Sequence, residues 1–146
     1  MTDYGFKDKV VLIAGGAKNL GGLLSRQIGR EGAKVVVHYN SDASRADAED
    51  TVKAVKDLGG EAYMTQGDLT RPANVEALFL EAKDKFGGID VAINTVGKVL
   101  RKPIVETSEE EYDSMFDINA KSAYFFIKEA GKHLNDNGKI VTVLTS

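Results

Sequence analysis

Short apolar runs alternate with amphipathic stretches along all 146 residues of the chain. The first run, residues 10–14, is entirely apolar and ends in glycines, which is typical of a strand buried on both faces of a sheet. Runs of the same kind predict four more strands, at residues 34–39, 62–66, 89–94 and 139–145. Between the runs, apolar residues at helical spacing predict four helices, and the last of these is long, covering residues 108–133.

The predicted helices carry recognisable end signals. Thr70 can cap the third helix, and a capping-box pattern at residues 107–110 opens the long one. Strands that alternate with helices in this way predict right-handed crossovers and an α/β fold, in which helices cover both faces of a parallel sheet. Because no linker, repeat or low-complexity segment interrupts the pattern, we expect a single domain over residues 1–146.

Composition and charge narrow the choice of partners. A net charge of -3 gives no electrostatic reason to expect a nucleic acid or an anionic membrane as partner. Cysteine is absent, and His38 and His133 have no partners at metal-ligand spacing, so we expect no disulfide and no metal. The first ten residues are polar and lack the apolar stretch of a signal peptide or membrane span, so a cytoplasmic protein is expected.

A glycine-rich segment, residues 15–22, connects the first predicted strand to the first helix. A tight turn of this kind needs residues without a Cβ, and it lets amides at the helix start approach a pyrophosphate, which the helix dipole also favours. A plain glycine-rich turn is the alternative, because a glycine motif alone is a weak signal. A P-loop is disfavoured, since Lys18 is followed by Asn19 and not by Ser or Thr.

The order of these glycines resembles the Thr-Gly-x-x-x-Gly-x-Gly loop of the short-chain dehydrogenase/reductase family. Gly15 and Gly21 take the first and last glycine positions, Ala14 replaces the threonine, and Asn19 replaces the middle glycine. Asparagine tolerates the left-handed backbone conformation better than most residues. The resemblance implies a Rossmann-type doubly wound parallel sheet with strand order 3-2-1-4-5, and it implies cofactor contacts from Gly15, Lys18, Asn19, Leu20 and Gly21.

Two later segments match the same family in order along the chain. Asp68 and Leu69 resemble the step after the third strand, where the family's carboxylate binds the adenine amino group; a plain helix-entry role is the alternative for Asp68. Residues 94–97 are similar to the Asn-Asn-Ala-Gly segment that shapes the floor under the adenosine ribose. The two middle residues depart from that pattern, so the cofactor-binding role is carried over to Asn94 and Gly97 alone.

Two catalytic assignments rest on the resemblance. Asn119 falls on the apolar stripe of the long helix, which predicts a buried amide, and a core asparagine with satisfied hydrogen bonds is the alternative to a functional one. In the family this asparagine holds a water that continues a proton relay from the active-site lysine. The last strand resembles the segment that ends in the catalytic serine; matching the serine itself selects Ser146, whereas a gapless match from Ile140 selects Thr145.

Hydride transfer to a ketone also needs an acid, which in this family is the tyrosine of a Tyr-x-x-x-Lys pair, about a dozen residues beyond the serine. The sequence ends at Ser146, so we expect this pair, and the last strands and helices of the domain, to belong to a longer parent chain. The chain by itself is expected to lack turnover. Tyr124 and Lys128 have the right spacing but lie upstream of the serine, so we expect Tyr124 to pack and Lys128 to be solvated.

The end of the second strand bears on the cofactor. NAD-selective sites carry Asp or Glu there, bonded to the ribose 2′-hydroxyl, but this chain has Tyr39, Asn40 and Ser41 at that place. Lys18 adds a cation near the same ribose, and a 2′-phosphate would be accepted by Lys18 and by the Asn40 and Ser41 side chains, so Tyr39, Asn40 and Ser41 are expected to bind the cofactor. NADP(H) is therefore the preferred cofactor, with NAD(H) as the alternative.

These observations favour an NADP(H)-dependent oxidoreductase that interconverts a carbonyl and a secondary alcohol, resembling the 3-oxoacyl-carrier-protein reductase and hydroxynaphthalene reductase branches of the family. A non-catalytic dinucleotide-binding or redox-sensing protein on the same fold is the alternative, and an interaction domain with a vestigial loop is a third. The expected partners are a small-molecule carbonyl or alcohol substrate and further copies of the chain, since the resemblance implies a homodimer or homotetramer through the long helix at residues 108–133.

Overall fold

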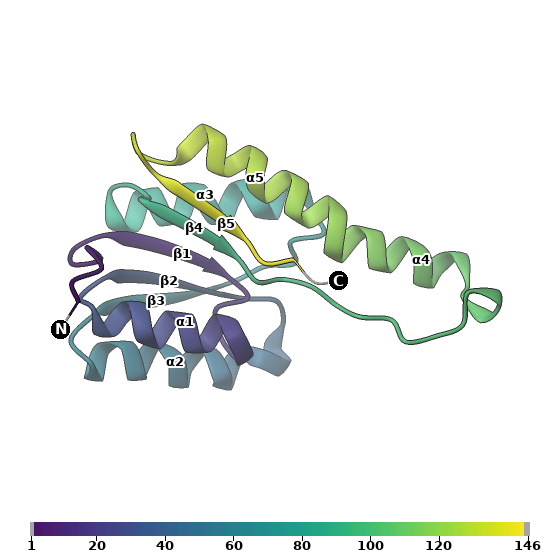
Figure 1. Ribbon diagram of the computed structural model, residues 1–146, viewed down its shortest axis with the longest axis horizontal. Helices are drawn as coiled ribbons and strands as arrows, with labels where there is room; N and C mark the ends of the chain where they lie inside the picture. The colour runs from purple at the N-terminus through teal and green to yellow at the C-terminus, as the bar shows by residue number, and fades with distance from the viewer. Residues whose placement is uncertain (1, 145–146) are drawn as a thin grey trace.

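The computed structural model describes residues 2–144, which form a parallel five-stranded sheet with strand order β3-β2-β1-β4-β5 (Figure 1). Every neighbouring pair of strands is parallel. The predicted α/β class and its strand order are therefore confirmed. The strands are β1 (Val10–Ala14), β2 (Lys34–Tyr39), β3 (Glu61–Gln66), β4 (Val91–Asn94) and β5 (Lys139–Thr142).

Helices cover both faces of this sheet (Figure 1). On one face α1 (Asn19–Arg30) packs beside α2 (Arg45–Asp57), and on the other α3 (Pro72–Phe86) packs beside α5 (Ser122–His133). This two-sided arrangement follows from crossovers of one hand that leave the sheet in opposite directions on the two sides of β1. No helix among residues 2–144 is long and apolar enough to cross a membrane.

The core has two layers, one on each face of the sheet. Val11 and Ile13 belong to the layer under α1 and α2, whereas Leu12 packs in the layer under α3 and α5. Successive side chains of a strand face opposite sides, so a strand with both faces covered must be apolar throughout. In the second layer the rings of Phe79 and Phe126 meet edge to face, with their centroids 5.1 Å apart.

The predicted single helix over residues 108–133 is wrong in its middle. The segment consists of α4 (Glu109–Phe116), one π-helical stretch (Asp117–Lys121) and α5. A π turn spaces its backbone hydrogen bonds one residue wider than an α-helix does, and it shifts the faces of the two flanking helices relative to each other. Such turns are frequent at functional sites.

Two predicted helix caps are also corrected. The capping box lies one residue later than predicted: the Glu111 N–H donates to Ser108 Oγ at 3.2 Å, and the Ser108 N–H donates to the Glu111 carboxylate at 2.9 Å. Thr70 does not cap α3, because its hydroxyl donates to Asp68 instead, and the cap position is held by Arg71.

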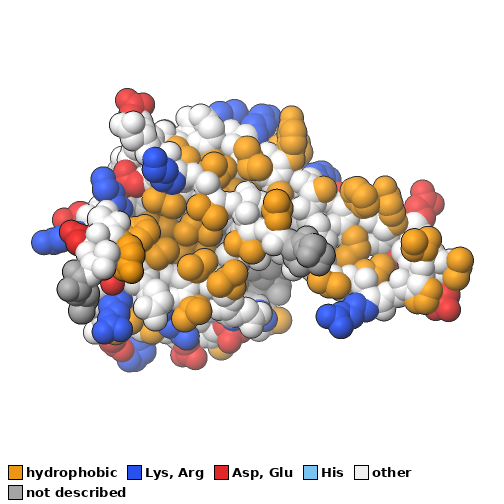
Figure 2. Space-filling model, viewed as in Figure 1, with side chains coloured by type: hydrophobic (Ala, Val, Ile, Leu, Met, Phe, Trp, Pro, Cys, Tyr) orange, Lys and Arg blue, Asp and Glu red, His pale blue; other side chains and the backbone are white. Residues whose placement is uncertain are grey.

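Apolar side chains gather on the surface at two places (Figure 2). One is β5 at the edge of the sheet, where Ile140 and Val141 are 40% and 46% exposed. The other is the projecting segment that contains α4 and the short helix before it, Ile104–Glu106, in which Ile104 is 92% exposed. Neither surface contributes to the core of the described residues.

Candidate functional site

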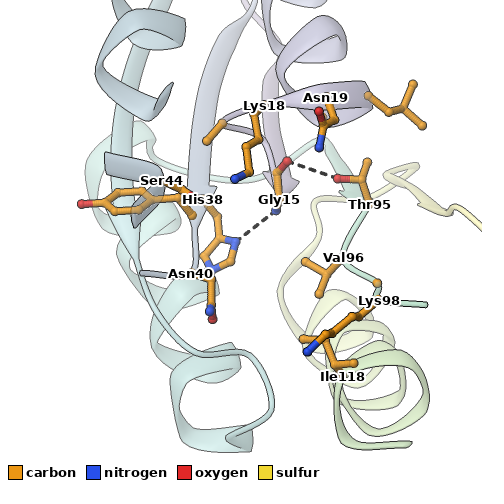
Figure 3. Close-up of a pocket in the computed structure, with 15 residues that line it drawn as sticks. Gly15, Lys18, Asn19, His38, Asn40, Ser44, Thr95, Val96, Lys98 and Ile118 are labelled. Carbon is orange, nitrogen blue, oxygen red and sulfur yellow. Dashed lines mark hydrogen bonds between the residues drawn. The ribbon is translucent and has the colours of Figure 1, made fainter. Parts of the chain in front are cut away.

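A cleft of about 370 Å³ opens at the carboxyl ends of β1, β2 and β4 (Figure 3). This is where open α/β sheets bind their ligands, and the volume is that of a cofactor-sized pocket. The cleft brings together eight of the predicted cofactor-binding residues: Gly15, Lys18, Asn19, Leu20, Gly21, Tyr39, Asn40 and Gly97. Four other predicted residues, Ser41, Asp68, Leu69 and Asn94, do not line it.

The glycine-rich turn that forms one wall depends on residues that accept unusual backbone angles. Gly15 has φ of 73° and Asn19 has φ of 52°, so the asparagine adopts the left-handed conformation expected of it. A Cβ at Gly15 would lie 2.7 Å from Thr95 Oγ1, and one at Gly21 would overlap the Gly15 carbonyl oxygen. The turn is therefore as tight as the motif predicts.

The start of α1 presents backbone amides to the cleft. The first intrahelical bond runs from the Gly22 N–H to the Lys18 carbonyl at 2.9 Å, so the amides of residues 19–21 have no partner within the helix. Lys18 holds the cap position without a side-chain cap, and the first turn carries no acidic residue. Free amides at the positive end of a helix dipole suit a pyrophosphate.

Thr95 joins the end of β4 to this turn. Its hydroxyl lies 2.8 Å from the Ala14 carbonyl. It also lies 3.3 Å from the Gly15 carbonyl (Figure 3). Thr95 stands where the family pattern has asparagine, and the structure shows that its hydroxyl bridges β4 and the glycine turn. Sequence reasoning had set this residue aside as a departure from the motif.

Sequence reasoning also missed His38 as a residue of the cleft. The imidazole is 2% exposed, its Nδ1 accepts from the Gly15 N–H at 3.1 Å, and its Nε2 lies 2.7 Å from the Gly67 carbonyl oxygen. Burial lowers the pKa of His38 from 6.5 to about 4, against a smaller upward effect of the Gly67 carbonyl. The ring is neutral at ordinary pH. The other lining residues that the sequence did not single out include Ser44, Thr95, Val96, Lys98 and Ile118.

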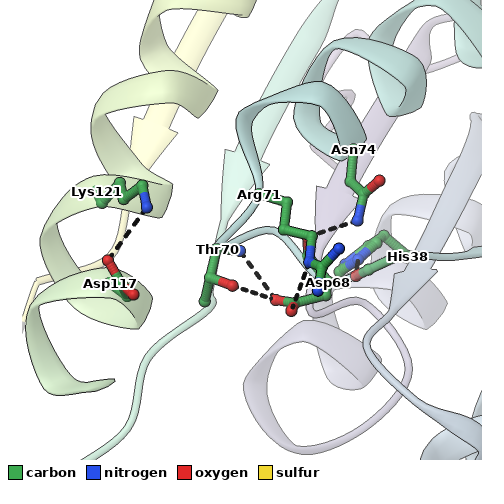
Figure 4. Close-up of polar contacts among 8 residues, drawn as sticks. His38, Asp68, Thr70, Arg71, Asn74, Asp117 and Lys121 are labelled. Carbon is green, nitrogen blue, oxygen red and sulfur yellow. Dashed lines mark hydrogen bonds and ion pairs between the residues drawn. The ribbon is translucent and has the colours of Figure 1, made fainter. Parts of the chain in front are cut away.

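Asp68 lies beyond the cleft in the connection between β3 and α3 (Figure 4). One carboxylate oxygen accepts from the Thr70 hydroxyl at 2.7 Å and from the Thr70 N–H at 3.0 Å, and the other lies 4.0 Å from Arg71 Nε. The Thr70 hydroxyl, opposed by partial burial, holds the pKa of Asp68 below its usual value. Leu69 is 2% exposed and packs in the core layer under α3 and α5, so its side chain does not reach the cleft.

Asn94 and Asn119 line a second hollow of about 380 Å³ beside the first, and the chain after β5 passes along it. Asn94 is 2% exposed, and its side-chain oxygen accepts from the Val96 N–H at 2.9 Å. Asn119 is exposed, so the prediction of a buried amide is wrong. It lies in the π-helical stretch, which turns its side chain toward the Lys98 backbone, where it accepts from the N–H at 2.9 Å and donates to the carbonyl at 2.8 Å.

The predicted catalytic Ser146 and the alternative Thr145 lie outside the described residues 2–144. The residues just before them, Val143 and Leu144, line the second hollow with Asn119. Tyr124, the tyrosine of the upstream Tyr-x-x-x-Lys match, is 67% exposed and packs its ring on Phe125. It lines neither hollow.

The charge of the cleft is positive. Lys18 and Lys98 line it, and no acidic side chain of residues 2–144 does. Lys18 Nζ is 3.9 Å from Asp47, but both side chains are about half exposed, so this ion pair is weak. Within the described range no three His, Asp or Glu side chains form a group that could hold a metal ion.

Comparison with known proteins finds a matching family model and related sequences. A family model described as enoyl-(acyl carrier protein) reductase matches residues 15–146. The short chain dehydrogenase mdpC of Emericella nidulans is 34% identical over 138 residues, which cover 94% of this chain and 51% of that protein. The hydroxynaphthalene reductase-like protein Arp2 of Metarhizium brunneum is 33% identical over 140 residues, covering 96% and 52%. The chain thus spans about half the length of the curated relatives it matches.

Solved structures share the fold. A Burkholderia cenocepacia protein described as a dehydrogenase, with bound NADP, is 61% identical with a TM-score of 0.95, over 99% of this chain and 55% of that one. The NADH-dependent reductase A1-R', complexed with NAD, is 26% identical with a TM-score of 0.87, over 94% of this chain and 59% of that one. One relative is therefore seen with each dinucleotide.

Proposed function

Because the chain belongs to the short-chain dehydrogenase/reductase family of oxidoreductases, we propose that the full-length protein interconverts a carbonyl and a secondary alcohol by hydride transfer with NADP(H). The observation that carries this proposal is the cleft at the start of α1, where free amides, a left-handed turn and two lysines converge. The substrate is a small-molecule carbonyl or alcohol.

The residues of the chain would hold the dinucleotide along the carboxyl edge of the sheet. The amides of residues 19–21 would bind the pyrophosphate, and Asp68 would border the adenine together with Leu69, which could do so only through its backbone because its side chain lies in the core. Asn94 and Gly97 would shape the floor under the ribose, since the Asn94 side chain already fixes the Val96 amide. The dinucleotide, when bound, supplies or accepts the hydride.

The catalytic assignments remain with Ser146 and Asn119. In this proposal the Ser146 hydroxyl polarises the substrate carbonyl, and a Tyr-x-x-x-Lys pair elsewhere in the full-length protein provides the acid. The amide of Asn119 is bonded to the Lys98 peptide, so its side chain anchors the loop after β4 beside the second hollow. Asn119 would hold the relay water from this position.

The preference for NADP(H) over NAD(H) rests on the end of β2. Lys18 and the neutral side chains of Asn40 and Ser41 would accept a 2′-phosphate, and no carboxylate lines the cleft within the described chain to repel it. The relative with bound NADP supports this choice, and the one complexed with NAD keeps NAD(H) as the second candidate.

The test is calorimetric titration of the full-length protein with NADPH and NADH, followed by NADPH oxidation in the presence of a panel of ketones. We expect tighter binding of NADPH, and turnover with at least one ketone class. Lys18→Ala should weaken NADPH binding about tenfold and leave NADH nearly unchanged, because one charge-assisted contact is lost. Lys83→Ala, which removes an exposed lysine on α3 outside the cleft, is the matched control.

The outcomes separate the candidate functions. Binding without turnover on any ketone would favour a non-catalytic dinucleotide-binding or redox-sensing role, and no binding of either dinucleotide would contradict the proposal.

We also propose a cytoplasmic homodimer or homotetramer in which α4 and α5 meet their counterparts. Sedimentation of the full-length protein tests that assembly.

A further inference from the structure

One buried side chain, His38, joins the ends of three strands (Figures 3 and 4). It lies near the end of β2, its Nδ1 is 3.1 Å from the Gly15 nitrogen after β1, and its Nε2 is 2.7 Å from the Gly67 carbonyl oxygen after β3. Its own carbonyl also accepts from the Gly16 N–H at 2.9 Å. No other side chain among the described residues bonds to both the glycine turn and the β3–α3 connection.

The two side-chain bonds select one form of the ring. The Gly67 carbonyl oxygen can only accept a hydrogen bond, so Nε2 must carry the hydrogen. The Gly15 N–H can only donate one, so Nδ1 must be unprotonated. The neutral Nε2–H tautomer alone satisfies both partners. In a protonated ring Nδ1 would also carry a hydrogen, so two donors, Nδ1–H and the Gly15 N–H, would face each other. An aliphatic side chain of similar size would leave the Gly15 N–H and the Gly67 carbonyl without these hydrogen-bond partners.

The Gly15 peptide is thereby held from two sides. Its N–H donates to His38, and its carbonyl faces the Thr95 hydroxyl at 3.3 Å. A turn in the left-handed conformation has few other restraints, because glycine has the largest backbone freedom of any residue. Since the Gly15 amide is engaged, the amides that remain for a ligand are those at the start of α1, which the fixed turn aims into the cleft.

We infer that His38 is a positioning residue for dinucleotide binding: it anchors the Gly15 turn to the connection that carries Asp68, so the pyrophosphate wall of the cleft and the proposed adenine border beyond it have their final spacing before the ligand arrives. This inference rests on the dinucleotide-binding function proposed above. Its physical basis is preorganisation, because a loop fixed in advance loses less conformational entropy on binding.

Two neutral substitutions separate the two bonds in the full-length protein. His38→Asn places an amide oxygen near the Nδ1 position, where it can still accept from Gly15, but it is too short to reach Gly67. His38→Gln places an amide donor near the Nε2 position, where it can still reach Gly67, but it leaves Gly15 without its acceptor. Val36→Ala is the control for general destabilisation of the fold. It creates a cavity in the same strand, on the side that faces the core under α3 and α5.

We expect His38→Gln to raise the Kd for NADPH about tenfold and His38→Asn to raise it by no more than about threefold, from the usual strength of one hydrogen bond. Hydrogen–deuterium exchange of the ligand-free protein should show faster exchange across residues 14–21 in His38→Gln and little change there in His38→Asn or Val36→Ala. A merely structural role would lower the unfolding temperature in all three variants without this local difference.

Separate results bear on the two proposals. If the unsubstituted protein binds neither NADPH nor NADH, the proposed function fails. If it binds NADPH and His38→Gln binds equally well, or loses affinity only as much as Val36→Ala, the positioning role of His38 is overturned. Unchanged exchange of residues 14–21 in His38→Gln would overturn it as well.

Discussion

Gly21 is the residue at which one added methyl group should matter most. A Cβ there would overlap the Gly15 carbonyl oxygen and lie 2.8 Å from Thr95 Oγ1, and a backbone atom cannot move aside as a side chain can. Forced overpacking typically costs about 1–3 kcal/mol, so the free turn should relax away from the overlap, and binding must then restore the binding geometry at that cost, where each 1.4 kcal/mol is a factor of ten in affinity. We therefore expect Gly21→Ala to raise the Kd for NADPH about tenfold or more, measured by calorimetry.

The matched control is Gly131→Ala, because a Cβ at that position in α5 would meet no atom within 4 Å. This substitution should leave NADPH affinity unchanged and stabilise the helix by about 0.5–1 kcal/mol. Equal affinities of the two variants would show that the Gly15 turn is not the ligand-binding element.

At the scale of single residues, the sequence predicted the features that depend on local backbone conformation. Gly15 and Gly21 were predicted because a tight strand-to-helix turn needs residues without a Cβ, and Asn19 because it stands at a glycine position of the family loop and tolerates the left-handed conformation. The role of His38 was not, since its two partners lie 23 and 29 residues away and only the folded sheet brings them together. Asn119 was expected to be buried because an unbroken α-helical period was assumed through it, whereas it lies in a π turn.

Among the elements, α4 depends on its cap. It is eight residues long, none of them buried, so packing against the core contributes little, and the reciprocal bonds between Ser108 and Glu111 hold its first turn. Loss of a capping side chain usually costs about 1 kcal/mol. We expect Ser108→Ala to speed amide exchange in α4 by about fivefold, as such a loss implies. Ser114→Ala, within the same helix, should not.

Buried strands leave a clear hydrophobic pattern in the sequence, whereas a π turn does not. All five residues of β1 are buried, so the strand had to be a continuous apolar run, and its bounds were predicted without error. β5 was predicted to reach residue 145 but ends at Thr142, because the apolar run continues past its last pairing with β4. The π turn widens one helical repeat and leaves no distinct residue pattern, which is why the long helix looked uniform.

At the scale of the whole molecule, Asp90 links segments that are distant in sequence. One carboxylate oxygen accepts from the Val10 N–H at 2.9 Å, and the other accepts from the Asn135 side chain at 3.0 Å, so β1, β4 and the approach to β5 meet at one residue. Burial raises the pKa of Asp90, but the Val10 and Asn135 hydrogen bonds outweigh it and bring the pKa below its usual value.

We expect Asp90→Ala to lower the free energy of unfolding by about 1–3 kcal/mol, because the Val10 amide loses its partner. Urea denaturation checks this value, and Asp136→Ala, an exposed residue of the same region, should change stability by no more than about 0.5 kcal/mol. A double variant with Asn135→Ala should be less destabilised than the sum of the two single variants.

The order of the strands that Asp90 joins was predicted from the family resemblance. Hydrophobic periodicity alone predicts parallel strands but not which strands are neighbours in the sheet.

The pH dependence of folding provides a last test, because one buried ring should dominate it near neutrality. His38 is neutral in the folded chain down to about pH 4, whereas an unfolded histidine takes up a proton near pH 6.5. Between these values the unfolded state binds more protons, so the stabilising effect of the neutral ring is complete above pH 6.5 and is lost as the pH falls to about 4. The lowered pKa of Asp68 and of Asp90 adds a further loss only in more acid solution, as those carboxylates protonate.

The expected loss from His38 is about 3 kcal/mol, at 1.36 kcal/mol for each unit between the two pKa values. Urea denaturation of the full-length protein at a series of pH values between 7 and 4.5 measures most of it. His38→Gln cannot titrate, so its stability should start lower at pH 7 and fall less steeply, and the curves of the two proteins should converge toward pH 4.5. Parallel curves would mean that the ring takes up its proton at the same pH in the folded and unfolded chains, so that below about pH 6.5 the folded ring would lack the acceptor that holds Gly15.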